Sequence, residues 1–195
     1  MILIFTPKIT NRVRYTFKTV FYDYLLFRDF KITDDQGKFL AHKGPKFTYS
    51  KEPIASLPHF QAKDLLFETG VKEQDIQFGS LGKLPVLFTL SKPSLLDFDV
   101  FSAVFFMLVR YEEYLPHQRD KYDRFEPTSS VAFQHGFLKK AVVDRWMLLL
   151  REKLSEVFPQ LVFPEKTYHY IPTIDIDNAF EYKEKGVMRT VGAFL

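Results

Sequence analysis

The sequence contains no cysteine in its 195 residues. Disulfide bonds, thiolate metal ligands and a thiol nucleophile are therefore excluded from any mechanism of this chain. Long hydrophobic runs are also missing, since the longest, residues 100–109, is about half of what a transmembrane helix requires. A secretory signal begins with basic residues and continues with a longer apolar run than residues 2–5. We therefore expect a cytoplasmic protein without a membrane partner.

Neither sign of charge is in large excess. The chain has 27 basic and 24 acidic residues, a net charge of +3. This is far below the basic density of a dedicated nucleic-acid binder, so we expect no nucleic-acid partner. Aromatic side chains, in contrast, are abundant: 22 Phe and 10 Tyr accompany one Trp. Aromatic packing should therefore dominate the core.

Hydrophobic spacing predicts strands that alternate with helices. The predicted strands are residues 2–5, 29–33, 46–50, 84–90 and 168–176. The predicted helices are residues 11–25, 100–109 and 141–158, with a shorter one at 62–68. We expect the second and third strands to pair as a hairpin after a turn at residues 34–37. The sequence thus predicts an α/β fold with helices packed on a mixed sheet.

Two carboxylates, Asp175 and Asp177, end the last predicted strand. Alternation along a strand would place both on one face at its carboxyl end, where α/β folds hold their active sites. Like charges about 7 Å apart repel each other, so a divalent metal or an acid/base role would explain the pair. In the alternative, structural interpretation, Asp177 or Asn178 caps the next helix and Asp175 meets a buried cation or backbone amides.

Residues 171–180 resemble the opening of the catalytic domain of NodB-type polysaccharide deacetylases, and the resemblance continues through residues 182–192. The whole chain is similar to an uncharacterised amino-terminal region that precedes this domain in a group of bacterial proteins. The markers of that similarity are residues 110–117 and 120–125. The resemblance implies an accessory domain at residues 1–167. It also implies that residues 168–195 are the first βα unit of a truncated deacetylase (β/α) barrel.

The resemblance further implies that Asp175 is the general base and that Asp177 is a ligand of a divalent metal, usually zinc. Many members have adjacent aspartates, whereas Ile176 separates them here. The second motif of the family, a His-x₃-His or His-x₄-His pair, has no counterpart among the histidines at 42, 59, 117, 135 and 169. A catalytic zinc normally has three protein ligands. We therefore expect an inactive fragment that binds no zinc tightly.

The full-length protein implied by this resemblance hydrolyses acetyl groups on a carbohydrate substrate. The partner expected for residues 1–167 is the protein's own carboxyl-terminal catalytic domain. Two other function classes stay open. One is a non-catalytic carbohydrate-binding or scaffolding module. The other is a magnesium-dependent phosphatase or nucleotidyl transferase of the Asp-x-Asp type, against which Ala179 counts because those enzymes normally have Thr or Val at that position.

The 110–125 segment combines charged and aromatic side chains, which suit sugar stacking or an interdomain contact. The candidate residues for such a surface are Arg110, Tyr111, Glu113, Tyr114, Tyr122 and Arg124. In the structural alternative, the segment is a helix end with i to i+4 ion pairs, and Pro116 ends the helix.

Overall fold

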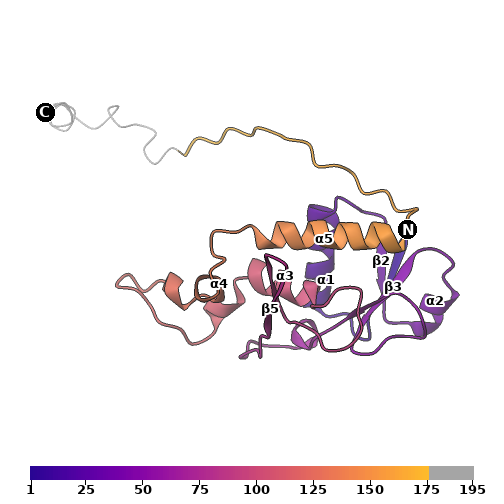
Figure 1. Cartoon of the computed structure of the whole chain (residues 1–195), viewed down its shortest axis with the longest axis horizontal. Helices are drawn as coiled ribbons and strands as arrows, with labels where there is room; N and C mark the ends of the chain where they lie inside the picture. Colours follow the sequence, from indigo (N-terminus) through magenta and orange to yellow (C-terminus); the bar gives the residue numbers. More distant parts are fainter. Residues whose placement is uncertain (176–195) are drawn as a thin grey trace, which may run out of the picture. The chain divides into compact units, whose positions relative to one another are not determined.

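A computed structural model describes residues 1–175 (Figure 1). The chain divides into two compact units, Met1–Glu165 and Lys166–Leu195. All helices and strands of the described residues lie in the first unit. Asp177 and the rest of the implied first βα unit, residues 176–195, lie outside the described residues. The predicted domain boundary at 167/168 stays a prediction.

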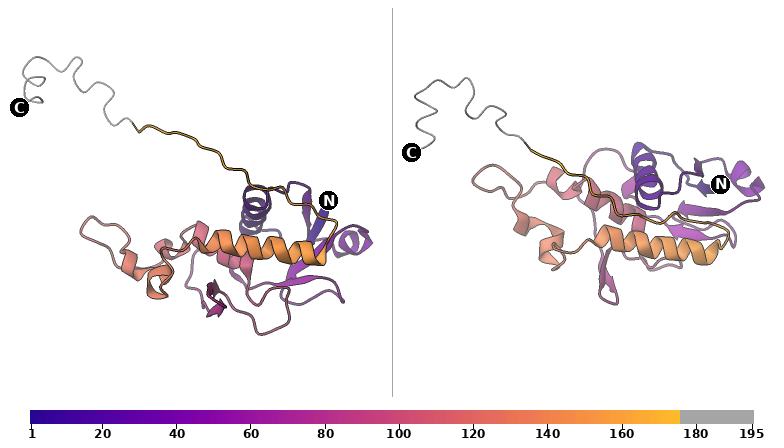
Figure 2. Two further views of the ribbon diagram at one scale, coloured as in Figure 1. Left: turned by 45° about the horizontal axis from the view of Figure 1, so that its top comes forward. Right: turned by 90° about the horizontal axis from the view of Figure 1, so that it is seen from above.

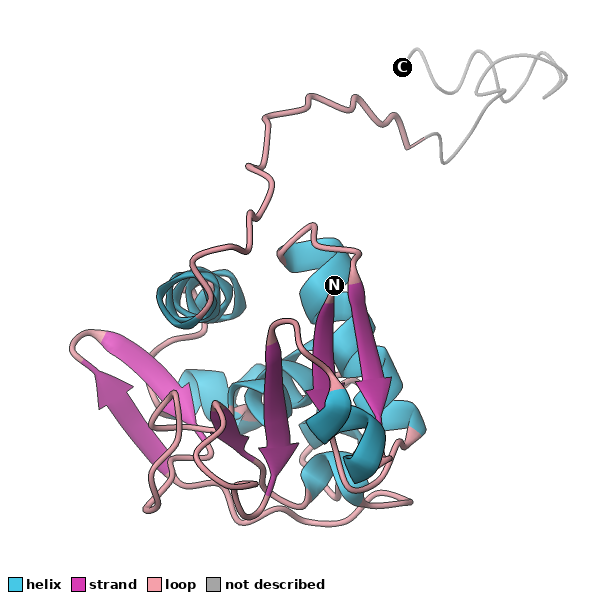
Figure 3. Ribbon diagram, turned by 90° about the vertical axis from the view of Figure 1, so that its right-hand side faces the viewer, coloured by secondary structure: helices cyan, strands magenta, loops and turns pink. Residues whose placement is uncertain are grey.

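The principal sheet has four parallel strands (Figure 3). They are β1 (Ile2–Phe5), β2 (Phe30–Thr33), β3 (Lys46–Ser50) and β4 (His59–Gln61), in the order β2-β1-β3-β4. A separate antiparallel pair consists of β5 (Phe78–Leu81) and β6 (Leu84–Leu87). The α/β prediction is confirmed, but the strands form two sheets of different kinds instead of one mixed sheet.

The predicted hairpin between β2 and β3 is wrong. Residues that suggested a turn begin a helix, α2 (Gln36–Ala41), because the Asp35 side chain accepts a hydrogen bond from the backbone N–H of Lys38 at 3.0 Å. A helical crossover lets two strands run parallel, which a tight turn cannot do. β2 and β3 accordingly lie on opposite sides of β1.

Three predicted helices are confirmed. The first is α1 (Asn11–Lys18), capped by Thr10 and continued by the π-helical η1 (Thr19–Tyr24). The second is α3 (Val100–Leu108), capped by Asp99. The third is α5 (Val142–Val157), the long orange helix in Figure 2. The helix predicted at 62–68 is reduced to the 3₁₀ turn η2 (Leu65–Phe67).

Several shorter elements were not predicted from the sequence. They are the strands β4 and β5, the helix α4 (Val131–Gln134) and the 3₁₀ turns η3 (Tyr111–Tyr114) and η4 (Pro127–Ser129). Each has four residues or fewer, which is too short for apolar spacing to repeat over several periods.

The two faces of the sheet carry cores of unequal size. Ile2 and Ile4 belong to the large core that contains the apolar side chains of α1, α3 and α5. Leu3 and Phe5 point the other way and form a small buried cluster with Phe39 of α2, against which the partly buried Ile54 and Leu57 pack. The helices α1 and α2 therefore cover opposite faces of the sheet. Aromatic packing dominates the large core, where the Phe101 ring stacks on Phe17 with centroids 4.4 Å apart.

The strand predicted at residues 168–176 is not formed by its described part, residues 168–175. The side chains of Tyr168, Tyr170, Ile171 and Ile174 are 77–88% exposed. A strand exists through backbone hydrogen bonds to a neighbouring strand, and apolar alternation does not supply that neighbour. In the part of the chain that the structure describes, no helix is long and apolar enough to cross a bilayer.

Candidate functional site

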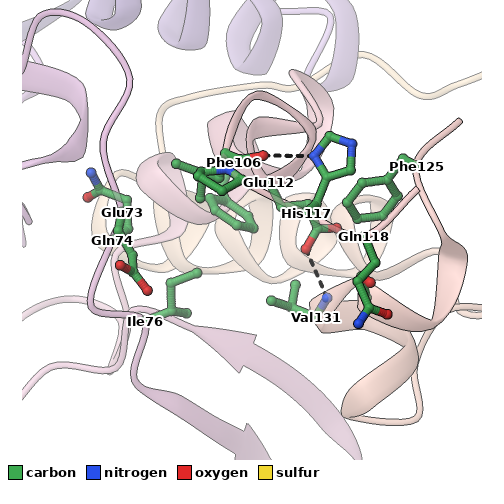
Figure 4. Close-up of a pocket in the computed structure, with 12 residues that line it drawn as sticks. Glu73, Gln74, Ile76, Phe106, Glu112, His117, Gln118, Phe125 and Val131 are labelled. Atoms are coloured by element: carbon green, nitrogen blue, oxygen red, sulfur yellow. Dashed lines mark hydrogen bonds between the residues drawn. The ribbon is translucent and has the colours of Figure 1, made fainter. Parts of the chain in front are cut away.

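A pocket of about 580 Å³ lies at the carboxyl end of α3 (Figure 4). We call it the α3-end pocket. The segment before β5, the last turn of α3 and residues 112–131 form its walls. The lining residues are Glu73, Gln74, Ile76, Phe106, Glu112, Leu115, Pro116, His117, Gln118, Phe125, Ser129 and Val131.

The chain reversal after α3 creates this pocket. Arg110 adopts a left-handed backbone conformation (φ 53°), which ends the helix and starts η3. The reversal directs Tyr111 into the core, where its ring centroid lies 5.6 Å from that of Phe106. The Tyr111 hydroxyl donates to the backbone carbonyl of Lys72 at 3.0 Å and accepts from its N–H at 3.1 Å. These bonds attach the segment before β5 to the end of α3.

Glu112 is the half-buried carboxyl group of the pocket. One of its oxygens accepts a hydrogen bond from the backbone N–H of Val131 at 2.9 Å, drawn as a dashed line in Figure 4. Burial raises the pKa of Glu112, and the nearby Glu113 charge adds to this effect, while the bond from Val131 opposes it. A carboxyl group with a raised pKa in a concave site is typical of binding or catalytic positions.

His117 adds an imidazole with a fixed orientation. Its Nδ1 lies 2.7 Å from the Leu115 carbonyl oxygen. Because a carbonyl can only accept, Nδ1 carries the hydrogen of the neutral ring and Nε2 is left as an acceptor. The imidazole packs against the Phe125 ring with centroids 4.9 Å apart. The pocket thus combines a carboxyl group, an imidazole and an aromatic ring.

The six residues predicted for a binding surface do not line this pocket, although all belong to the described chain. Tyr111 was wrongly predicted at the surface: it is 2% exposed because its ring completes the core beside Phe106. Arg110 forms an ion pair with Glu113.

The other three predicted residues lie in solvent-exposed positions. Tyr114 and Tyr122 are 70% and 63% exposed. The Tyr122 ring has Lys121 Nζ and Arg124 Cζ each 4.8 Å from its centroid. Arg124 pairs with Asp120 at 2.6 Å, and this bond lowers the pKa of Asp120 to about 2. Such i to i+4 pairs agree with the structural interpretation of these charges.

The segment selected from the sequence contributes to the wall of this pocket, but through residues other than the six that were named. Glu112, His117 and Phe125 belong to the same 110–125 segment as the six predicted residues, but their side chains line the pocket and those of the six do not. Gln74 and Ile76 come from a stretch with no clear periodicity in the sequence. Contacts between segments about 40 residues apart brought them here.

The predicted carboxylate pair belongs to the other unit of the chain, Lys166–Leu195. Asp175 is exposed and belongs to the unit Lys166–Leu195, and Asp177 lies outside the described residues. Within residues 1–175, no group of three or more His, Asp or Glu side chains could hold a metal ion. The roles predicted for Asp175 and Asp177 stay predictions.

Residues 2–159 match the sequence model of a family described as a family of unknown function, DUF7033. The chain belongs to the DUF7033 family. Neither a curated protein nor a solved structure matches it. The DUF7033 region contains the parallel sheet, the small core, the large core except Leu161 and Phe163, and every residue of the α3-end pocket.

Proposed function

We propose that the DUF7033 region is a carbohydrate-binding accessory domain and that the α3-end pocket holds the sugar. The supporting observation is the chemistry of the pocket. Phe125 offers an aromatic ring, while Glu112 and His117 offer hydrogen-bonding groups beside it. Sugar rings have apolar C–H faces edged by hydroxyl groups, and such mixed surfaces are bound by aromatic rings with a few polar groups around them.

The pocket also suits an acetylated amino sugar in size and polarity. Its volume of about 580 Å³ falls in the range of small-molecule sites. An acetamido N–H can donate to the Glu112 carboxylate, and a sugar hydroxyl can donate to Nε2 of His117. The exposed Gln118 at the rim adds an amide that both donates and accepts.

Calorimetry with oligomers of N-acetylglucosamine tests this proposal. Phe125→Ala should weaken binding at least about tenfold, because it removes the stacking ring. Phe133→Ala is the matched control, since Phe133 is 51% exposed and does not line the pocket. The affinity of this variant for the oligomers should stay within about twofold of the wild-type affinity. Absence of heat from the wild type, or equal affinities of the two variants, would overturn the proposal.

We further propose that this domain accompanies a polysaccharide deacetylase domain. The support is the resemblance of residues 171–180 to the first motif of NodB-type enzymes, in which Asp175 is the base and Asp177 a metal ligand. A catalytic zinc site normally has three protein ligands, and residues 1–175 contain no group of three or more His, Asp or Glu side chains that could hold a metal ion.

The gene sequence tests the second proposal directly. It should encode a His-x₃-His or His-x₄-His motif within about a hundred residues after Leu195, as the resemblance implies. The full protein should then release acetate from acetylated amino-sugar oligomers, and Asp175→Asn should reduce the rate at least about a hundredfold. A full-length sequence without the histidine pair would refute the proposal while leaving the binding test of the α3-end pocket valid.

A further inference from the structure

A second pocket, of about 540 Å³, lies at the carboxyl ends of β1 and β3. We call it the β1/β3 pocket. It is distinct from the α3-end pocket, with which it shares no lining residue. Its lining residues are Phe5, Pro7, Lys8, Gln36, Ser50, Lys51, Glu52, Pro53, Ile54, Asp64 and Phe67.

The topology of the parallel sheet explains why a crevice forms here. In the order β2-β1-β3-β4, the chain runs from β1 to β2 toward one edge of the sheet. It runs from β3 to β4 toward the opposite edge. In open α/β sheets, the connections separate at such a reversal of strand order and leave a crevice outside the carboxyl ends of the strands. Pro7 and Lys8 follow β1, and the connection at residues 51–54 follows β3.

The small core on the α2 face gives the pocket its apolar wall. Phe5 belongs to the cluster that contains just two other buried side chains, Leu3 and Phe39. Ile54, from the β3–β4 connection, packs against this cluster at its edge. Phe67 and two prolines extend the apolar surface of the pocket.

The charges in the pocket leave one cation without an acidic partner. Lys51 Nζ pairs with Asp64 at 2.6 Å, and Glu52 pairs with Lys92. Lys8 Nζ donates to the backbone carbonyl of Phe67 at 3.3 Å and forms no ion pair with any described residue. The ammonium group of Lys8 keeps two further N–H donors. The pocket therefore presents one uncompensated positive charge beside an apolar wall.

We propose that the β1/β3 pocket binds a monoanionic small molecule with an apolar body, such as an arylalkyl carboxylate. Its apolar part lies against Phe5, Ile54 and Phe67, and its carboxylate accepts hydrogen bonds from Lys8. One uncompensated ammonium matches one negative charge, whereas a dianion would meet the carboxylates of Glu52 and Asp64. This site is independent of the proposed sugar site.

Titration of the ¹⁵N-labelled chain with 3-phenylpropionate tests the proposal. The backbone amide signals of Lys8, Ser50, Lys51, Glu52 and Ile54 should shift with saturation. The neutral analogue 3-phenylpropionamide should bind at least about fivefold more weakly, because it lacks the charge that Lys8 attracts. Phenyl phosphate, as the dianion, should also bind more weakly than the carboxylate.

Three variants separate the role of the charge from that of the fold. Lys8→Gln should weaken carboxylate binding at least about fivefold and leave binding of the amide unchanged, whereas Lys8→Arg should retain the affinity within about twofold. Lys139→Gln, outside the pocket, is the control for overall charge. No saturable shift at these amides, or equal binding of acid and amide to the wild type, would overturn the proposal.

Discussion

At the scale of single residues, the carboxylate of Asp99 accepts several buried hydrogen bonds, and the residue is 1% exposed. Its carboxylate accepts hydrogen bonds from the Tyr49 hydroxyl, from the Lys63 N–H and from both the N–H and the hydroxyl of Ser102. It thus caps α3 and ties β3 and the segment after β4 to it. Burial raises the pKa of Asp99, and the bonds from Ser102, Lys63 and Tyr49 oppose that effect.

Removing this carboxylate should be costly. Asp99→Ala leaves several buried donors without an acceptor, so we expect the free energy of unfolding to fall by about 3 kcal/mol. Asp97→Ala is the matched control, since Asp97 is exposed, and its effect should stay within about 0.5 kcal/mol. Urea unfolding followed by circular dichroism measures both values. Equal stabilities of the two variants would contradict the role assigned to Asp99.

A second prediction at this scale concerns pH. Burial lowers the pKa of His59 below 6.5, and its Nδ1 lies 2.7 Å from the Thr48 hydroxyl. The folded state therefore binds the His59 proton less readily than the unfolded state does. Stability should fall as the pH drops below about 6.5 and level off below the folded pKa. His59→Gln should reduce this decline, measured as the urea midpoint between about pH 7 and pH 5. An unchanged pH dependence in the variant would contradict the prediction.

At the scale of elements, α5 shows how well a long amphipathic pattern is predicted. Trp146, Leu150 and Leu154 recur at helical spacing, and all three are fully buried. Trp146 also donates from Nε1 to the Pro85 carbonyl at 2.8 Å, which joins α5 to β6. The opposite face carries exposed residues such as Leu148, at 64% exposure.

Two leucines of α5 allow a matched test of this packing. Leu150→Ala should lower the free energy of unfolding by about 3 kcal/mol, because it leaves a cavity in the large core. Leu148→Ala makes the same chemical change on the exposed face and should cost less than about 0.5 kcal/mol. Thermal and urea unfolding measure the free energy of unfolding of both variants. Similar decreases in the two variants would show that the orientation of α5 is wrong.

At the scale of the whole molecule, the division into Met1–Glu165 and Lys166–Leu195 predicts where the cooperative fold ends. The DUF7033 match to residues 2–159 falls within the first unit. A chain that ends at Glu165 should therefore unfold in a single transition, with a midpoint within about 2 °C of that of the 195-residue chain. Differential scanning calorimetry measures this. A midpoint lower by about 10 °C would show that residues 166–195 contribute to the folded unit.

The sequence predicted long elements better than the pairing of strands. Apolar spacing located α1 and α3 because this signal is local, and the structure shows Thr10 and Asp99 as their amino-terminal caps. The predicted pairing of β2 with β3 was wrong because hydrogen bonds between distant segments decide which strands pair. Asp35 resembles a turn residue in the sequence, and it caps a helix in the fold.

The candidate site divides in the same way. Charge and aromatic density located the 110–125 segment, since composition is readable along the chain. Because Arg110 has a left-handed backbone conformation, the Tyr111 side chain packs in the core and the Glu112 side chain lines the pocket. No local sequence pattern predicts these two side-chain directions, because the direction of a side chain after a helix end depends on the residues that pack around it.

The sequence alone determined the α/β class, the three long helices and the aromatic nature of the core, since each follows from composition or short-range periodicity. Only the tertiary structure decided the parallel order β2-β1-β3-β4 and both pockets. The β1/β3 pocket exists because the connections diverge at neighbouring strands, and the α3-end pocket exists because Tyr111 holds the Lys72 backbone. Both depend on contacts between residues far apart in the chain, whose free energy is gained only when the whole unit folds.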